Sequence, residues 1–386
     1  WWIIISCWLR KCEPKRKGGG ILEMLNSDSN IFRIAGFDLS DDTPPLFFAE
    51  IGAFFGQDVN LARSMIEQIL DARNQVPQQP LLLKTEVLHD PEICLPGDTM
   101  ETYASKNGLV KEENYRALIE RKSLPLDKYA ELFEMCTLAG LPFITSVYDL
   151  AGADLAAECG AVALKIASSN IIHVPLIRHC ARKGVPIILD TGRATLAEVD
   201  NAITIATEAG CEKMVIQHSP DGHPALPRAH NLKTLETYQH AFGLPVGLSD
   251  HHVGLEMMYM AIAMGASVIE KGVHVAPDDL DIDISHTMHM SDLVVVMRSI
   301  FDCWSALGLS FRDMQKPIEG VLGTSQRQCL VANSDINAGD KISLENVRFA
   351  FPCRGISVEH WNLVEGEVLR RPVSAGRPVQ WGDIEL

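Results

Sequence analysis

The segment AVALKIASSNIIHVPLIRHCARKGVPIILDTG, residues 161–192, decides the fold class of this chain. It contains two runs, 161–169 and 185–192, which are apolar over nearly their whole length, as strands covered on both faces are. Between them, 174–184 has the apolar spacing of a helix and ends in Gly184. Strand, helix and strand in this order predict a parallel βαβ unit.

The same alternation extends in both directions along the chain. It predicts eight buried strands, at residues 46–53, 80–87, 141–149, 161–169, 185–192, 212–219, 244–251 and 267–275. Eight strand–helix units over about 230–260 residues indicate an α/β fold, a closed (β/α)8 TIM barrel. The alternative is an open doubly wound sheet, which usually has a glycine-rich phosphate turn after its first strand. The turn GAFFGQD at 52–58 does not fit that pattern.

The end of the chain has a different character. Residues 327–386 hold short strand-like pieces and turn signals with almost no helical periodicity, and 335–347 resembles 372–384. This pattern predicts a second, small β-rich domain with internal pseudo-symmetry. The expected organisation is a leader, a barrel, a linker and the small domain, at residues 1–23, 24–314, 315–326 and 327–386.

Composition excludes several classes of protein. The chain has 386 residues, a net charge of −16 and 47% hydrophobic residues, the balance of a globular protein rather than a fibrous or disordered one. The acidity argues against a nucleic-acid partner, because a phosphate backbone needs a basic face. The 10 cysteines include no C-x-x-C pair, so we expect scattered buried thiols rather than a zinc site or a disulfide framework.

The leader is unusual. Residues 1–23 hold three of the six Trp, and the first Met is Met24. Our hypothesis is that 1–23 are an upstream read-through or added segment, with an interfacial membrane anchor as the alternative. No other apolar stretch reaches the roughly 18 residues of a membrane span, so we expect the remainder to be cytoplasmic and without a membrane partner.

Polar residues gather at the ends of the predicted strands, where TIM barrels carry their active sites. Lys84, Lys165 and Lys271 at one end of an acidic protein predict a site for an anion. Ordinary lysine–carboxylate pairs are the alternative explanation for these three lysines.

Imidazoles follow several of the same strands and suggest a metal site. The sequence SDHH at 249–252 ends one strand, and imidazoles bind divalent metals of the Mn, Fe and Zn kind. We therefore expect His251, with His218 and His274, to form a metal site with open positions.

Motifs in both predicted domains carry a resemblance to a known family. Those of the barrel are AEIG (49–52), LLLKTE (81–86), FITSVYD (143–149), KIASS (165–169), PIILDTG (186–192), GLSDH (247–251) and GASVIEK (265–271). Those of the small domain are GDKISLENV (339–347), GIS (355–357) and AGRPVQWGDI (375–384). In this order and spacing, over residues 46–386, the chain resembles the sialic acid (N-acetylneuraminate) synthase family as a divergent member.

The resemblance implies a fold and an activity. The fold is a (β/α)8 barrel followed by an antifreeze-like (SAF) domain of the β-clip type. The activity is condensation of phosphoenolpyruvate with an N-acetylated amino sugar, usually N-acetylmannosamine, to give a nonulosonic acid and phosphate. The implied cofactor is a divalent metal, typically Mn²⁺, which orients the sugar aldehyde. The implied assembly is a swapped homodimer, in which each small domain covers the partner's barrel.

The resemblance also assigns roles to residues. Glu50 looks like the family's glutamate near the sugar and the metal, and Lys84 and Lys165 look like its phosphoenolpyruvate-binding lysines. These three are the expected catalytic residues, and His251 looks like the first metal ligand. The expected substrate contacts are Ser146, Ser168, Asn170, Asp190, Asp221, Ser249, Lys271 and Arg354.

Two departures from the family pattern add negative charge. Asp190 replaces a phosphate-contacting serine and Asp221 replaces an asparagine. Each unscreened contact between like charges would cost on the order of 1–4 kcal/mol, so both aspartates are expected to oppose a bound phosphate.

Three further departures change expected contacts. Gly272 stands where the family has its second metal histidine, and His274, one pleat further along, is expected to replace it. Asn170 replaces a glutamate, and Arg354 or Arg348 has to stand in for the arginine of the family's RPGTG sequence.

Three functions therefore remain open at this point. The first is an active condensing enzyme that uses phosphoenolpyruvate and an amino sugar. The second is a diverged barrel enzyme with a different, non-phosphate substrate. The third is a non-catalytic, sugar-binding relative.

Overall fold

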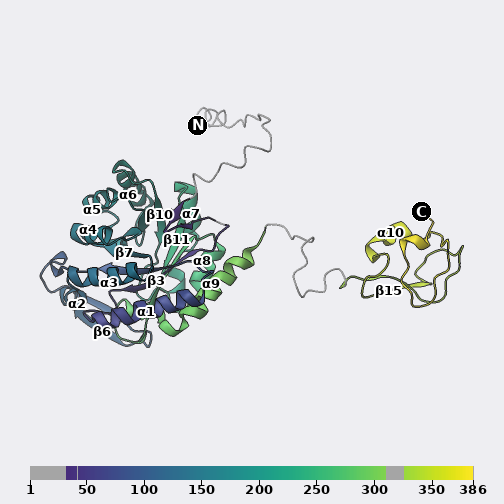
Figure 1. Cartoon of the computed structure of the whole chain (residues 1–386), viewed down its shortest axis with the longest axis horizontal. Coiled ribbons are helices and arrows are strands. Elements are labelled where there is room, and N and C mark those ends of the chain that lie inside the picture. Colours follow the sequence, from purple (N-terminus) through teal and green to yellow (C-terminus); the bar gives the residue numbers. More distant parts are fainter. Residues whose placement is uncertain (1–31, 41, 310–325, 386) are drawn as a thin grey trace, which may run out of the picture. The chain divides into compact units, whose positions relative to one another are not determined.

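The computed structural model of the chain describes residues 32–40, 42–309 and 326–385, and these form two compact units, one on each side of the junction between Gly308 and Leu309 (Figure 1). The expected leader, 1–23, and nearly all of the expected linker, 315–326, lie outside the described residues. Among the described residues no helix is long and apolar enough to cross a membrane.

A closed barrel of eight parallel strands forms the first unit, as far as the structure describes it. Its strands are β3 (Leu46–Gly52), β4 (Leu81–Val87), β7 (Phe143–Val147), β8 (Ala163–Ile166), β9 (Ile187–Asp190), β10 (Met214–His218), β11 (Val246–Asp250) and β12 (Val268–His274). Each strand pairs in parallel with the next, and β12 pairs with both β11 and β3, which closes the ring. The predicted (β/α)8 barrel is therefore confirmed.

Helices surround the barrel and cover the outer faces of its strands (Figure 1). They are α1 (Val59–Gln75), α3 (Leu126–Leu138), α4 (Leu150–Glu158), α5 (Val174–Ala181), α6 (Leu196–Glu208), α7 (Thr234–Phe242), α8 (Glu256–Ala263) and α9 (Leu293–Leu307). Side chains cap the starts of some of them: Thr195 and Glu198 form a capping box at α6, and the Asp149 carboxylate accepts from Gly152 N–H at α4.

Smaller elements complete this unit. The polar segment after β4 folds into the antiparallel pair β5 (Met100–Ala104) and β6 (Val110–Asn114), followed by α2 (Tyr115–Lys122). The pair β1 (Arg33–Ile34) and β2 (Phe37–Asp38) precedes the barrel, and β13 (Met288–His289) adds to β12. Ile34 and Leu39 pack against the apolar interior of the barrel.

Alternation along the strands divides the barrel interior into layers. One apolar cluster contains Phe48, Leu82, Ile144, Ala163, Ile188, Val215 and Val268, one residue from each of seven strands. Side chains two residues further along a strand point to the same side, so the next layer toward the carboxyl ends is also set by the sequence. That layer is polar.

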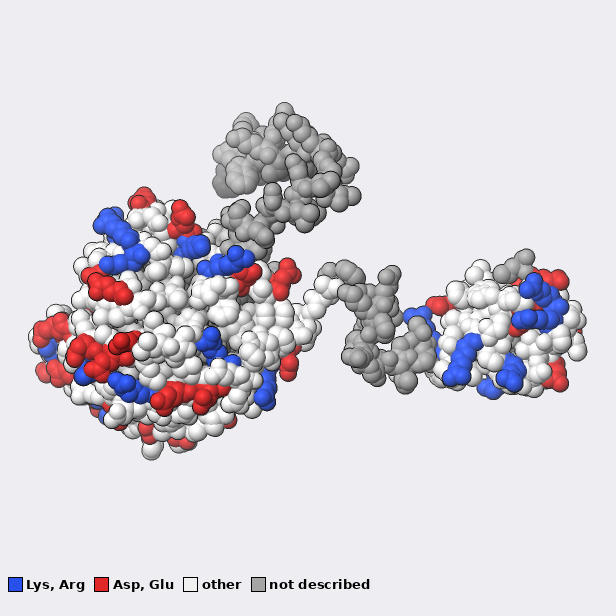
Figure 2. Space-filling view, viewed as in Figure 1, with Lys and Arg blue, Asp and Glu red and all other residues white. Residues whose placement is uncertain are grey.

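The second unit is small and mostly irregular. Its elements include β14 (Cys329–Ala332), antiparallel to β15 (Val347–Ala350), and α10 (Trp361–Val364), around a core that includes Leu330, Ile342 and Val379. The two segments that resemble each other in sequence meet here, because Ile336 and Val373 exchange two main-chain hydrogen bonds of 2.9 Å. On the face drawn in Figure 2, acidic and basic side chains are interspersed on both units.

Candidate active site

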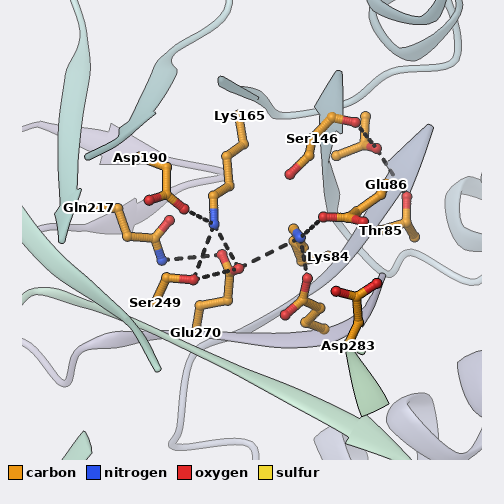
Figure 3. A network of polar contacts seen from close by, with 12 residues as sticks. Lys84, Thr85, Glu86, Ser146, Lys165, Asp190, Gln217, Ser249, Glu270 and Asp283 are labelled. Carbon is orange, nitrogen blue, oxygen red and sulfur yellow. Dashed lines mark hydrogen bonds and ion pairs between the residues drawn. The ribbon is translucent and has the colours of Figure 1, made fainter. Parts of the chain in front are cut away.

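A layer of polar side chains crosses the barrel at the carboxyl ends of its strands, which we call the polar layer (Figure 3). Each of the eight strands contributes one buried residue, and the most exposed, Glu50, is 6% exposed. The members are Glu50, Lys84, Ser146, Lys165, Asp190, Gln217, Ser249 and Glu270. The strand-end analysis thus placed Glu50, Lys84, Lys165, Ser146, Asp190 and Ser249 correctly at one face of the barrel.

Lys165 is held by three oxygen atoms from three other strands of the barrel. Its Nζ lies 2.7 Å from Glu270 Oε1 and 2.9 Å from Asp190 Oδ2, and it donates to Ser249 Oγ at 3.3 Å. Ser249 in turn donates to Glu270. An ammonium group has three N–H donors, so Lys165 has a partner for each of them.

Lys84 is also surrounded by carboxylates. It forms ion pairs with Glu50 and with Glu86, the latter at 3.1 Å, and lies 3.6 Å from Glu270. Counted with Lys165 and Asp190, four carboxyl groups therefore face two lysines. The sequence analysis gave lysine–carboxylate pairs as the alternative to an anion site. These pairs are present, and they lie where the anion was expected to bind.

Burial and the neighbouring charges give two glutamates of the polar layer very different pKa values. Burial raises the pKa of Glu50 to about 7, although Lys84 opposes the change and Glu270 adds to it. Burial also disfavours ionisation of Glu270, but Lys165 and Lys84 outweigh it and lower the pKa of Glu270 to about 2. Glu50 is thus the group in the polar layer that can exchange a proton near neutral pH.

Lys271 does not join the polar layer. Its neighbour Glu270 faces the barrel interior, and alternation turns Lys271 to the opposite side of β12. There its Nζ lies 2.9 Å from Asp250 Oδ2 and donates to the carbonyls of His252 and Gly254. The structure therefore brings two of the three expected lysines together, and the third has a buried structural pairing.

The expected metal ligands have separate environments. His218 Nε2 makes a hydrogen bond with the carbonyl of His230, and His274 Nδ1 accepts from Ala276 N–H at 2.9 Å. In the part of the chain that the structure describes, no three His, Cys, Asp or Glu side chains form a group that could hold a metal ion as they stand. His218, His251 and His274 therefore do not assemble the site expected for them.

His251 instead has two other imidazoles as neighbours. Its ring centroid lies 4.4 Å from that of His223 and 4.7 Å from that of His286, and these two lie 5.2 Å apart. Burial lowers the pKa values of His251 and His286 well below the usual range, so both rings are neutral. Nδ1 of each is buried and has no hydrogen-bond partner. Sequence reasoning missed His223, in the loop after β10, and His286, at the end of the 3-10 helix Ile284–His286 after β12.

The family's second histidine position has no room for a side chain. A Cβ atom built on Gly272 would lie 2.8 Å from Thr287 Cγ2 and 3.3 Å from the ring of Phe54. The loops that hold Thr287 and Phe54 therefore fill the space that a ligand at this position would need.

The remaining expected contacts are spread more widely. Ser168 and Asn170 lie on the short 3-10 helix Ser168–Asn170 after β8, and Asn170 Nδ2 is buried without a partner. Asp221 pairs with Arg193 at 2.7 Å, and both are largely exposed. Arg354 is exposed and belongs to the small unit.

Two members of the site, Gln217 and Glu86, were absent from the expected set. Gln217 Nε2 donates to Glu270 Oε2 at 3.1 Å, and Glu86 lies between Lys84 and Tyr148. Alternation along the strands predicts the inward orientation of Glu86, Gln217 and Glu270. Each lies an even number of residues from a residue of the same strand that faces the barrel interior, so its side chain points to the same side.

Comparisons with known proteins support the two-domain organisation. The NeuB family matches residues 83–311, and the SAF domain matches residues 327–385. The N,N'-diacetyllegionaminic acid synthase of Legionella pneumophila is 29% identical over 287 residues, covering 72% of this chain and 80% of that protein. The pseudaminic acid synthase of Helicobacter pylori is 25% identical over 346 residues, covering 89% and 98%.

A solved structure supports the fold independently. The N-acetylneuraminic acid synthetase of Leptospira borgpetersenii superposes with a TM-score of 0.64 at 22% identity, covering 75% of this chain and 93% of that one.

Proposed function

The chain belongs to the NeuB family, with an SAF domain after its barrel, and we propose that it condenses phosphoenolpyruvate with the open-chain aldehyde of an N-acetylated amino sugar. The product is a nonulosonic acid and inorganic phosphate. The observation that carries this proposal is the polar layer, in which Glu50, Lys84 and Lys165 meet at the carboxyl ends of the barrel strands. Relatives named as synthases of diacetyllegionaminic and pseudaminic acid support an amino-sugar acceptor.

The reaction forms a carbon–carbon bond and a bond from water oxygen to C2, and it breaks the bond between C2 and the phosphate oxygen. C3 of phosphoenolpyruvate attacks the aldehyde carbon, the aldehyde oxygen gains a proton, and water adds to C2. The bond between C2 and the phosphate oxygen then breaks, which releases phosphate and leaves the 2-keto group. No protein nucleophile is required, so the side chains need only bind, orient and move protons.

Lys84 and Lys165 supply the positive charge for the carboxylate and phosphate of the donor. Both lysines are almost fully buried, where electrostatic attraction is stronger than in water. Glu50, with its pKa raised to about 7, is suited to deliver a proton to the aldehyde oxygen at neutral pH.

We also propose a divalent metal, most simply Mn²⁺, at the His251 side of the site. The fit rests on the buried, unpartnered Nδ1 atoms of His251 and His286. These two imidazoles, with His223 beside them, would hold the ion after a rearrangement of their side chains, because the three do not form a metal-binding group as they stand. When bound, the metal would polarise the sugar aldehyde as a Lewis acid. We further expect a homodimer in which the small domain of one chain completes the site of its partner.

The experiment that tests the function is a phosphate-release assay. Purified full-length protein is incubated with phosphoenolpyruvate, Mn²⁺ and a panel of N-acetylated amino sugars and other aldoses. We expect phosphate release only when an acceptor is present, and none from Lys165→Met. Absence of release across the whole panel would remove the proposal, and the diverged-enzyme alternative would then gain support from the Asp190–Lys165 pair.

A further inference from the structure

The carboxylate of Asp190 lies among three hydrogen-bond donors of the kind that bind anions. Lys165 Nζ is 2.9 Å from Oδ2, Ser219 Oγ donates to Oδ1 at 2.5 Å, and Gly192 N–H donates more weakly at 3.4 Å. An ammonium, a hydroxyl and a main-chain N–H directed at one group are what a bound phosphate or carboxylate requires. We call Lys165 Nζ, Ser219 Oγ and Gly192 N–H the anion cradle.

A second hydroxyl lies beside the cradle. A Cβ atom on Gly192 would lie 2.6 Å from Ser219 Oγ and 3.1 Å from Ser168 Oγ. Both hydroxyls therefore lie against the main chain at Gly192, where only a glycine fits. The cradle and Ser168 come from the ends of strands β8, β9 and β10, which are neighbours in the barrel.

An anion that enters the cradle has to displace a group already bound there. Lys165 uses its three donors on Asp190, Glu270 and Ser249. Glu270 is fixed by three further partners, Gln217 and Ser249 at 3.1 Å each and Lys84 at 3.6 Å. Asp190 is the last residue of β9, and the contacts described for its carboxylate are those of the cradle. It is therefore the group that an incoming anion would replace.

We propose that Asp190 is the resident anion of a phosphate-binding cradle and determines how strongly this protein binds a phosphorylated substrate. The carboxylate occupies the position of the ligand and repels a dianion that approaches Lys165. Phosphoenolpyruvate binds only after the Asp190 side chain has moved away. The inference rests on the proposed function only in taking this end of the barrel as the substrate site.

Titration calorimetry with inorganic phosphate as the probe tests the proposal without turnover. The full-length wild type is compared with Asp190→Ser and Asp190→Asn, each checked for folding by circular dichroism. Both variants are expected to bind phosphate at least tenfold more tightly than the wild type. The matched control is Asp154→Asn, a half-buried carboxylate on α4 that pairs with Lys183 and His179, and its phosphate affinity is expected to equal that of the wild type.

Two results would overturn the proposal. One is folded Asp190→Ser and Asp190→Asn proteins that bind phosphate no better than the wild type. The other is an equal gain in Asp154→Asn, which would mean that net charge alone sets the affinity. Failure of the proposed function is a separate result, because it appears as absence of phosphate release from the wild type whatever the binding data show.

Discussion

Replacement of Glu50 by glutamine is expected to remove a specific pH dependence of stability. Glu50 is buried in the polar layer with its pKa raised to about 7, whereas the ordinary value is 4.5. Between these pH values the unfolded chain has released this proton and the folded chain still holds it. The free energy of unfolding therefore falls as the pH rises through this window. Above and below the window, the contribution of Glu50 to that free energy does not change with pH.

The magnitude follows from the two pKa values. At about 1.4 kcal/mol per pH unit, the span from 4.5 to about 7 amounts to about 3 kcal/mol of unfolding free energy lost by the wild type. Glutamine has nearly the same shape and does not ionise. The unfolding free energy of Glu50→Gln, relative to the wild type, should therefore rise by about 3 kcal/mol between pH 4.5 and pH 8.

The assay is urea denaturation of both proteins at closely spaced pH values, followed by far-ultraviolet circular dichroism. Taking the difference between the two proteins removes the contributions of groups that do not interact with Glu50, including those of the small domain. The control is Glu67→Gln on the exposed side of α1, for which the difference should not vary with pH. A pH-independent difference for Glu50→Gln as well would refute the reasoning.

Three other perturbations have defined outcomes. Lys271→Met should cost about 3–5 kcal/mol in urea denaturation, because it leaves Asp250 buried and charged without its ammonium partner. Mn²⁺ at a hundredfold excess over its Kd should stabilise the wild type by about 2.7 kcal/mol in a thermal shift assay, and His251→Ala should lose this response. Gly272→Ala should destabilise by about 1–3 kcal/mol, because its Cβ would lie 2.8 Å from Thr287 Cγ2, and Thr287→Ser in the same chain should restore most of the loss.

These three predictions fail in different ways. A Lys271→Met protein as stable as the wild type would mean that the other partners of the Asp250 carboxylate, His230 Nε2 and the His252 N–H, are enough to stabilise its charge. An unchanged Mn²⁺ response in His251→Ala would exclude His251 as a ligand. A Gly272→Ala protein that is not rescued by Thr287→Ser would mean that the crowding comes from elsewhere.

The architecture could be predicted because buried parallel strands and amphipathic helices have clear periodic signals. The same signals placed Glu50, Lys84 and Lys165 at one end of the barrel. Pairing between side chains was harder to predict, because it depends on which of two adjacent residues faces inward. Glu270 and Lys271 illustrate this: in a strand that is buried on both faces, hydrophobicity alone does not distinguish the two sides.

Loop positions account for the other differences. His223 and His286 approach His251 from separate loops, and nothing in their local sequence spacing indicates that they meet. The expected charge repulsion from Asp190 and Asp221 also depended on partners that the sequence does not reveal. Asp190 is paired with Lys165, and Asp221 with Arg193.

The central claim is that the protein condenses phosphoenolpyruvate with a sugar aldehyde. Identifying the bond that breaks in phosphoenolpyruvate tests this claim most directly. Phosphoenolpyruvate labelled with ¹⁸O at the bridging oxygen is incubated with the protein, Mn²⁺ and an acceptor sugar, and the products are examined by mass spectrometry. The account predicts that released phosphate retains the ¹⁸O, because the C2–O bond breaks, together with a keto acid that contains all the carbons of both substrates. Unlabelled phosphate accompanied by pyruvate, or no phosphate release with any acceptor, would contradict it.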